Sequence, residues 1–488
     1  MEKTRIKTIC GLELRKISCT LRALIIAQVF LLVIGAQAWG DHDHEKKVNC
    51  NKGETITHAL KECDGKPITI QVKGTCNENV TIDRDDVTLI AHPSGGAING
   101  VEPIDATIII MGDRTVIDGL TVTGGGAGIR VRGNNNMIRN CTVQNVGWNG
   151  IPFPDGNGTV DNCKILNSGM NGVSIGGGGS ATVTNSTIQN SGYHGVNISG
   201  GGRATVTKST ISSNTLRGIL VYQGGNGYID NCTIQNNGDD GILIEAANAT
   251  VIKSTISSNG SAGIIVSRGG SAKIGMNGGG ANDGNTINNN QGSGIFISSG
   301  GSAYIRGNTI DGNGTGPNVI HGRSGILVAG ATATLFGGNI ITNNKHNGIQ
   351  AVSSSVFIGV EGFVPIENVI SGNDNGGIVG FLGSSLDIRY ATINGNNGNG
   401  VTLDLRSTAM MIGDTISNNT GNGILLSRGG GLSLQNPVVT VTGNTSFGLQ
   451  CNDAESSFSG NINGISGNYP THPDYPTEGQ VSSTCTGF

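Results

Sequence analysis

Apolar residues in this chain alternate with small polar residues over short segments, and these segments recur along the chain. Residues 172–194 read GVSI, GGGGS and ATVTNSTIQNSGYH, and residues 195–217 repeat the same three blocks. The apolar side chains fall on every second position, which is the period of a β-strand, and the repeats contain no 3.6-residue helical stripe. The pattern therefore predicts three short strands per repeat, separated by bends rich in glycine and asparagine.

The repeat keeps a regular length over most of the chain. Each unit is marked by a glycine followed by Ile, Val or Leu, at positions 128, 150, 172, 195, 218, 241, 263, 294, 325, 348, 377, 400, 423 and 448. Most of the spacings are 22 or 23 residues, which is typical of a solenoid of stacked coils. The longer units at 263–325 and 348–377 should bulge outward as loops.

Three strands per unit describe one coil of a parallel β-helix, with neighbouring coils about 4.8 Å apart. Glycine should supply positive φ at the bends, and the Asn-rich bends fit an internal ladder of amide side chains that includes Asn190, Asn214, Asn236 and Asn259. Parallel crossovers favour right-handed coiling. We therefore predict an all-β protein, a single-stranded right-handed parallel β-helix of about 14–17 coils. One column of inward side chains should be Ile129, Ile151, Val173, Val196, Ile219, Ile242 and Ile264.

The repeat also resembles that of a known superfamily. The phrase N/S-x-T-I-x-N-x-G-x-x-G-I/V, which runs from Asn162 to Val173, from Asn185 to Val196 and from Asn231 to Ile242, is similar to the generic repeat of pectin-lyase-like proteins. The resemblance covers roughly residues 80–460 and implies the right-handed parallel β-helix fold. It does not choose a function, because that superfamily includes polysaccharide lyases, glycosidases, epimerases, adhesins and non-enzymatic binding proteins.

Both ends of the chain depart from the repeat. Residues 1–38 combine a basic leader, a short apolar run and a small-residue site at Ala36-Gln37-Ala38, which predicts a signal peptide cleaved after Ala38, with a retained anchor as the alternative. Residues 39–78 should form a leader and an N-terminal cap with a short helix at 53–62. We expect the β-helix to occupy residues 79–468 and a capping tail to occupy residues 469–488.

Composition and charge agree with an exported repeat protein. Glycine accounts for 83 of 488 residues, but only 11 prolines and the absence of a Gly-X-Y period exclude collagen. Without residues 1–38 the chain keeps 24 basic and 32 acidic residues, a net charge of -8, which argues against nucleic acid as a partner. We expect a soluble monomer outside the cytoplasm, either secreted, periplasmic or on the cell surface.

The cysteines follow the same division of the chain. In an oxidising compartment we expect a Cys451–Cys485 disulfide and one pair among the N-terminal three, Cys50, Cys63 and Cys76. Three more cysteines occupy a small-residue position of the repeat and should be buried fillers: Cys141, Cys163 and Cys232. No Cys/His spacing matches a zinc site.

The most unusual residues stand directly before the repeating glycine. On three neighbouring coils these are His194, Arg217 and the pair Asp239-Asp240, which should converge within about 10 Å along one groove. A base, a cation and paired carboxylates suit sugar chemistry, so these four are the candidate catalytic residues. The candidate substrate-binding residues around them are Arg130, Arg132, Trp148, Tyr193, Asn197, Tyr222 and Glu245.

Two enzymatic interpretations of this cluster remain open. The segment Asn237–Ile242 resembles the GDD segment of polygalacturonase-type glycosidases, which implies that Asp239 and Asp240 act as acid and base. The neighbouring coils lack the Asp and the His of that family. A lyase would use Tyr193 or His194 with Arg217. Asp239, Asp240 and Glu245 would then form a candidate Ca²⁺ site.

The leading hypothesis is an exported β-helix protein that binds an extended polysaccharide or cell-surface glycan along the face that contains residues 130–270. One alternative is a polysaccharide lyase or glycoside hydrolase acting on an acidic polysaccharide, and a second is an adhesin or structural surface protein without catalysis. An outward apolar column is either covered by a loop or forms a contact surface. It consists of Leu220, Leu243, Ile265, Phe296 and Leu327.

Overall fold

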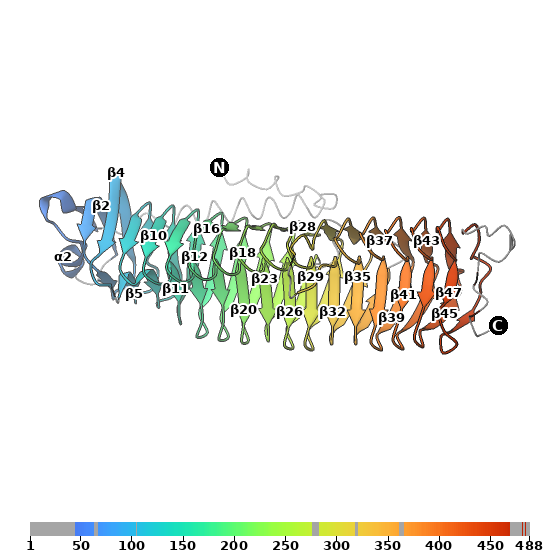
Figure 1. Cartoon of the computed structure of the whole chain (residues 1–488). Coiled ribbons are helices and arrows are strands. Elements are labelled where there is room, and N and C mark those ends of the chain that lie inside the picture. The colour runs from blue at the N-terminus through green and yellow to red at the C-terminus, as the bar shows by residue number, and fades with distance from the viewer. Residues whose placement is uncertain are drawn as a thin grey trace, which may run out of the picture. The chain divides into compact units, whose positions relative to one another are not determined.

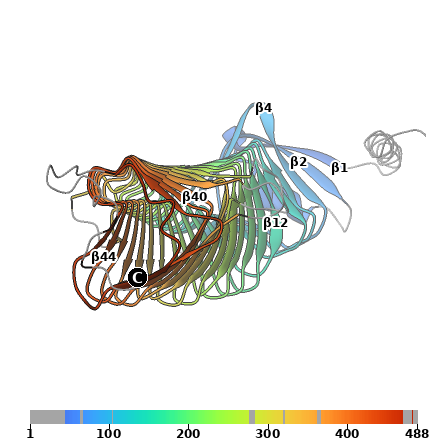
Figure 2. The ribbon, with the colours of Figure 1, turned by 90° about the vertical axis from the view of Figure 1, so that its right-hand side faces the viewer.

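The alternating pattern folds into coils of three strands each. The computed structural model describes residues 44–62, 67–103, 105–275, 283–317, 321–360 and 366–468, together with residues 481 and 484. The chain divides into two compact units, residues 1–45 and 46–488, and the second unit contains the β-helix, seen from the side in Figure 1 and at 90° to that view in Figure 2. Within the described residues, no helix is both long enough and apolar enough to span a bilayer.

One coil shows how the repeat is built. Strand β17 (Val196–Ile198) is followed by β18 (Arg203–Thr207) and β19 (Thr210–Ser212), and β20 (Ile219–Tyr222) begins the next coil. The chain turns at Lys208 with a φ of 48° and at Ser213 with a φ of 56°. Non-glycine residues therefore adopt the left-handed conformation at these two corners. Glycine supplies it, as predicted, between β17 and β18, where Gly200 and Gly201 have φ values of 56° and 78°.

The repeating glycines have a different role, which is close packing between coils. A Cβ on Gly241 would lie 2.5 Å from Cγ2 of Ile256 and 2.6 Å from the carbonyl oxygen of Gly263. Neither the backbone nor a buried side chain can move away cheaply at these distances. The glycines that recur every 22–23 residues thus mark the places where neighbouring coils approach each other most closely.

The coils stack into parallel sheets, and the helix has about 17 turns, as predicted. A 32-stranded sheet contains two strands of nearly every coil, including β18 and β19. The third strands form a 3-stranded sheet of β3 (Val80–Ile82), β5 (Ala106–Ile110) and β8 (Ala127–Val131). They continue in a 13-stranded sheet, here called the site sheet: β11 (Ile151–Phe153), β14 (Val173–Ile175), β17, β20, β23 (Ile242–Glu245), β26 (Ile264–Ser267), β29 (Ile295–Ser298), β32 (Ile326–Ala329), β35 (Ile349–Val352), β38 (Ile378–Phe381), β41 (Val401–Leu403), β44 (Ile424–Leu426) and β47 (Leu449–Cys451).

The core is a set of like-on-like columns. Val173 pairs in register with Val196, and Val196 pairs with Ile219. The whole predicted inward column is inaccessible to solvent, from Ile129 to Ile264. Burial of one branched aliphatic side chain contributes roughly 1.5–3 kcal/mol, so repetition of this column is a main source of stability.

An internal ladder of asparagines runs along the corner between β19 and β20 and the equivalent corners of the other coils. The Oδ1 of Asn237 accepts hydrogen bonds from the backbone and side-chain N–H groups of Asn214 at 3.2 and 2.9 Å, and the Oδ1 of Asn259 does the same for Asn237. Asn214 and Asn259 therefore occupy the predicted ladder. Asn190 and Asn236 do not, because they are exposed residues in the left-handed conformation, with φ values of 57° and 56°.

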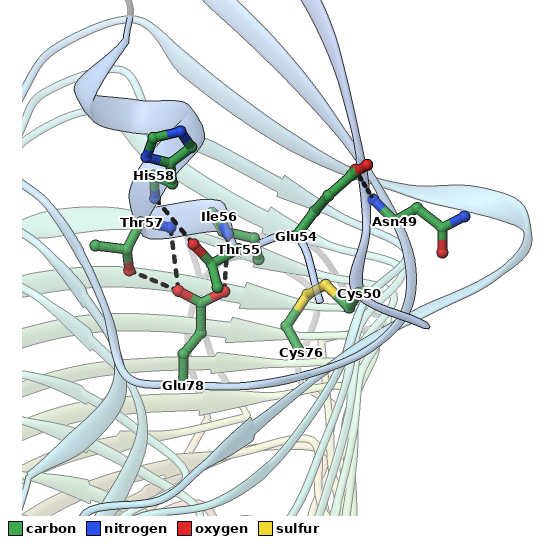
Figure 3. Close-up of a disulfide and its surroundings, with 9 residues drawn as sticks. All are labelled: Asn49, Cys50, Glu54, Thr55, Ile56, Thr57, His58, Cys76 and Glu78. Carbon is green, nitrogen blue, oxygen red and sulfur yellow. Dashed lines mark hydrogen bonds between the residues drawn. A yellow bond between two sulfur atoms is a disulfide. The ribbon is translucent and has the colours of Figure 1, made fainter. Parts of the chain in front are cut away.

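A short helix caps the N-terminal end, as predicted. Helix α2 (Ile56–Lys61) begins after Thr55, whose hydroxyl accepts the His58 N–H at 3.2 Å, and the Glu78 carboxylate accepts the Ile56 N–H at 2.7 Å (Figure 3). A Cys50–Cys76 disulfide fastens the chain before α2 to the end of β2 (Ile68–Asn77). The sequence predicted one pair among the three N-terminal cysteines without choosing it, and the structure pairs Cys50 with Cys76, while Cys63 lies outside the described residues.

The structure describes four of the other cysteines and a small part of the C-terminal tail. Three cysteines in the repeat are free and buried, as predicted: Cys141, Cys163 and Cys232. Cys451 is disulfide-bonded, whereas Cys485 lies outside the described residues, so the Cys451–Cys485 pair stays a prediction. Val481 forms a parallel bridge with Leu449, and the Thr484 hydroxyl donates to the Cys451 carbonyl oxygen. These described parts of the tail therefore contact the last coils.

Candidate functional site

The site lies at the corner where each coil enters the site sheet. The outer corner column consists of the residues two positions before the repeating glycine. Each backbone N–H in this column donates to the carbonyl oxygen of the previous coil, at 2.7–3.1 Å between Trp148 and Ser261. Six coils are thus held in register. Their outer corner residues are Trp148, Met170, Tyr193, Leu216, Asp239 and Ser261.

The next residue of each coil forms the inner corner column, where side chains accept backbone N–H groups of the following coil. Asn171 Oδ1 accepts the His194 N–H at 3.3 Å, and His194 Nδ1 accepts the Arg217 N–H at 3.3 Å. Asp240 Oδ1 accepts the Ala262 N–H at 3.2 Å. His194 and Asp240 therefore hold ladder positions that asparagine holds elsewhere in the same column.

Three of the four predicted catalytic side chains form an ion cluster at this corner. Arg217 Nη2 lies 2.9 Å from Asp239 Oδ2, and Arg217 Nε lies 3.2 Å from Asp240 Oδ2. Asp240 is 0% exposed, whereas the Asp239 and Arg217 side chains are partly open to solvent. His194 is buried beside the cluster and contacts it through the backbone of Arg217.

His321 completes the cluster and was missed by the sequence analysis. Its Nδ1 lies 3.4 Å from Asp240 Oδ1 and 2.7 Å from Ser261 Oγ, and its ring stacks on Phe296 with 5.4 Å between centroids. His321 belongs to the long connection between β31 (Thr309–Asp311) and β32. The 31-residue spacing from Gly294 to Gly325 was the available signal, because an excursion of that length can fold back over earlier coils.

Burial and neighbouring charges shift the titration of this cluster in different directions. Burial, reinforced by Asp240, raises the pKa of Asp239. A hydrogen bond to Asp240 raises the pKa of His321. Burial, with a smaller contribution from Arg217, lowers the pKa of His194 to about 4. His194 is therefore neutral near pH 7, and its Nδ1 lone pair is already used by the Arg217 N–H.

Four of the predicted binding residues form two pairs, one exposed to solvent and the other held in ion pairs. Trp148 and Tyr193 are exposed, at 41% and 47%, and Met170 between them is 37% exposed. Arg130 and Arg132 are ion-paired instead, with Asp105 at 3.4 Å and Asp155 at 3.1 Å respectively. We call Trp148, Met170 and Tyr193, two aromatic side chains with a methionine between them, the aromatic stripe.

The edge of the site sheet at which its strands end is separate from the ion cluster, which lies where the strands begin. Tyr222 and Glu245 pair in register at the ends of β20 and β23, and Glu245 forms an ion pair with Arg268 at 2.5 Å. The whole of β23 separates Glu245 from Asp240, so the structure does not assemble the predicted Ca²⁺ ligands. Among the described residues, no group of three or more His, Cys, Asp or Glu side chains is arranged to hold a metal ion.

The outward apolar column on the site sheet is largely covered. Leu243, Ile265 and Leu327 are buried, and Asn197 precedes Leu220 in the same column. At the Leu327 end, a Cβ on Gly322 would lie 2.6 Å from Leu327 Cδ2, which places the long connection directly over the column. Of the two alternatives for this column, the structure favours coverage.

The ladder role of His194 leads to a prediction about pH. Because its pKa is about 4 in the fold and about 6.5 when unfolded, the unfolded chain binds more protons between these values. The contribution of His194 is therefore fully present above pH 6.5 and is lost as the pH falls towards 4, by roughly 2–3 kcal/mol. His194→Asn keeps an acceptor for the Arg217 N–H and should unfold at neutral pH like the wild type, with a smaller loss of stability in acid.

Urea unfolding of both proteins at several pH values measures this difference. An identical loss for the two proteins between pH 6.5 and 4 would contradict the assignment of a buried neutral imidazole.

Comparisons with known proteins address the family. A family model described as "Right handed beta helix region" matches residues 127–279, 171–330 and 317–463. No curated protein matches the chain. Similar solved structures include the periplasmic alginate epimerase AlgG, with 14% identity over 69% of this chain and 73% of that chain and a TM-score of 0.36. The Dettilon tailspike protein has 15% identity over 74% and 62% of the two chains, with a TM-score of 0.35.

The Agl-KA catalytic domain has 15% identity over 92% of this chain and 69% of that chain, with a TM-score of 0.31. Likenesses this distant carry no argument about activity. The family model covers most of the coils described above, and its handedness agrees with the predicted one. The chain therefore belongs to the right-handed β-helix family, within the pectin-lyase-like superfamily.

Proposed function

We propose that this protein is exported and binds an extended polysaccharide or surface glycan along the outer corner column. The observation that carries the proposal is the aromatic stripe, in which three large side chains on consecutive coils are exposed together. Exposed apolar side chains grouped in one place mark binding sites more often than single ones do. Aromatic rings offer flat apolar faces on which a sugar ring can stack, together with polar edges.

The stripe is a regular and rigid platform. Backbone hydrogen bonds of 2.7 and 3.0 Å join Trp148 to Met170 and Met170 to Tyr193. The indole ring of Trp148 lies over Gly126, since a Cβ there would be 3.1 Å from the indole Cε3. A ligand that contacts all three side chains would run along the helix axis. Its binding would cost little free energy for ordering side chains, because the surface is already rigid.

Substitution of the stripe tests this function. Trp148→Ala and Tyr193→Ala should each weaken glycan binding about tenfold, because each removes one of the two aromatic contact faces of the platform. Both side chains are exposed, so thermal unfolding should change little. The measurement is affinity electrophoresis or calorimetry against a panel of plant, algal and microbial polysaccharides.

The matched control is Ile340→Ala, which removes an equally exposed side chain (45%) from β34 (Ile340–Thr342), on another sheet and several coils away. It should bind like the wild type. A protein that binds no member of the panel would contradict the proposed function.

A second candidate function is acid–base cleavage of an acidic polysaccharide at the end of the same column. It is favoured by one observation, the His321–Asp240 pair beside Asp239. A buried carboxylate on Nδ1 of a half-buried imidazole orients the ring and leaves Nε2 for proton transfer. Unsaturated products would indicate elimination and new reducing ends alone would indicate hydrolysis, whereas binding without products supports the first function.

A further inference from the structure

The surface around the aromatic stripe is uncharged over three coils. Beside the stripe, the inner corner column contributes Asn149, Asn171 and His194, which is buried and neutral near pH 7. The outward positions of the site sheet on the same coils are Pro152, Ser174 and Asn197, which pair in register. Amides and hydroxyls both donate and accept hydrogen bonds, which is the chemistry that sugar hydroxyls require.

The arginines that flank this surface are already compensated by carboxylates. On the neighbouring coils, Arg130 is paired with Asp105, and Arg217 is paired with both Asp239 and Asp240. Recruitment of either guanidinium by a ligand carboxylate would require an existing ion pair to be broken. For Arg217 it would also leave the fully buried Asp240 without its partner, which is costly.

Beyond the stripe, the outer corner column reaches an acidic cluster in which one guanidinium faces two carboxylates. Asp239 follows Leu216 along the outer corner column and is one coil beyond it. A ligand lying lengthwise on the stripe and extending past Tyr193 would therefore approach this partly exposed carboxylate. A uronic acid residue there would bring like charges together, whereas a neutral residue would meet a hydrogen-bond acceptor.

We propose that the stripe binds a neutral glycan, lengthwise along the helix axis, and discriminates against polyuronates. Trp148 and Tyr193 are two coils apart, about 10 Å along the axis, so one chain contacts both rings while it crosses Met170. This inference rests on the proposed function and adds the ligand class to it. It favours the neutral class over the acidic polysaccharide of the enzymatic alternative.

A matched pair of polymers tests the ligand class. Polygalacturonate and its carboxyl-reduced form share the same linkage and differ only in the carboxylate, and alginate and its carboxyl-reduced form provide a second pair. The neutral member of at least one pair should bind at least tenfold more tightly, with an affinity that changes less than about twofold between 0.05 and 0.5 M salt. Trp148→Ala and Tyr193→Ala should weaken that binding about tenfold.

Asp239→Asn tests the source of the discrimination. It should raise the affinity for the acidic member by about threefold or more and leave the affinity for the neutral member within twofold. Asp374→Asn is the matched control, because it removes the same charge from an exposed ion pair with Lys345 several coils away and should alter neither affinity.

The outcomes separate the two proposals. Tighter binding of the acidic members, or neutral binding that is unaffected by both alanine substitutions, would overturn the ligand class and its site while the protein remains a glycan-binding protein. Failure of the two pairs and of the wider panel to bind would overturn the proposed function itself.

Discussion

Replacement of Asp240 by alanine is expected to lower the free energy of unfolding by about 3–5 kcal/mol. Asp240 is fully buried, and its carboxylate contacts Arg217 Nε at 3.2 Å, His321 Nδ1 at 3.4 Å and the Ala262 N–H at 3.2 Å. The alanine would leave a partly buried guanidinium, an imidazole and a backbone N–H without their common partner. Arg217 would keep Asp239 and His321 would keep Ser261, so the cost comes from the Ala262 N–H left without an acceptor and from the loss of the buried carboxylate that joins these groups.

Equilibrium denaturation in urea measures this effect. Asp240→Asn should fall between the wild type and the alanine variant, since it keeps an acceptor for the Ala262 N–H but removes the charge. Arg268→Ala provides the surface control, because Arg268 pairs with Glu245 from a side chain that is 73% exposed, and it should cost less than about 1 kcal/mol. Equal stability of the Asp240→Ala and Arg268→Ala variants would show that the ion cluster does not stabilise this corner.

Replacement of Asn290 by leucine should have a similar effect, about 3–5 kcal/mol, in the interior ladder. The Asn290 Oδ1 accepts the Asn259 backbone N–H at 3.1 Å and its side-chain N–H at 2.9 Å, and the Asn290 Nδ2 donates to the Ile256 carbonyl at 3.1 Å. Leucine has similar bulk but offers none of these bonds, and each buried group left without a partner costs about 1–3 kcal/mol.

The neighbouring residue gives a control in the same bend. Asn289 is left-handed, with a φ of 55°, and glycine adopts that conformation freely. Asn289→Gly should therefore stay within about 1 kcal/mol of the wild type in the same urea titration. If Asn290→Leu and Asn289→Gly unfold at the same urea concentration, then the ladder contributes no more than an ordinary bend.

The period of the chain predicted most of the site. Once the repeating glycines were aligned, Arg217, Asp239 and Asp240 fell on adjacent coils, because a parallel solenoid stacks residues one repeat apart. The same register predicted the exposed corner residues Trp148 and Tyr193. It could not show that His194 serves as a ladder acceptor, because that role depends on where the imidazole nitrogen meets the backbone of the next coil.

His321 and Glu245 show where register alone is insufficient. His321 belongs to a longer unit and reaches Asp240 only because its connection folds back over Phe296. Glu245 is close to Asp240 in sequence, but an extended strand carries it to the far edge of the site sheet. Distance along the sequence therefore underestimated the spatial separation of Glu245 from Asp240 and overestimated that of His321 from Asp240.

The sequence by itself determined the β-helix, the number of its coils and the inward columns, since these follow from a period of two within strands and of 22–23 residues between coils. It also indicated the N-terminal cap, because residues 53–62 depart from that repeat. Only the tertiary structure decided which polar side chains are buried, which arginines are already paired and what covers the apolar column. The physical reason is that periodicity specifies the local contacts that every coil repeats, whereas charge compensation and coverage depend on the few side chains that break the repeat and on where long connections fold back.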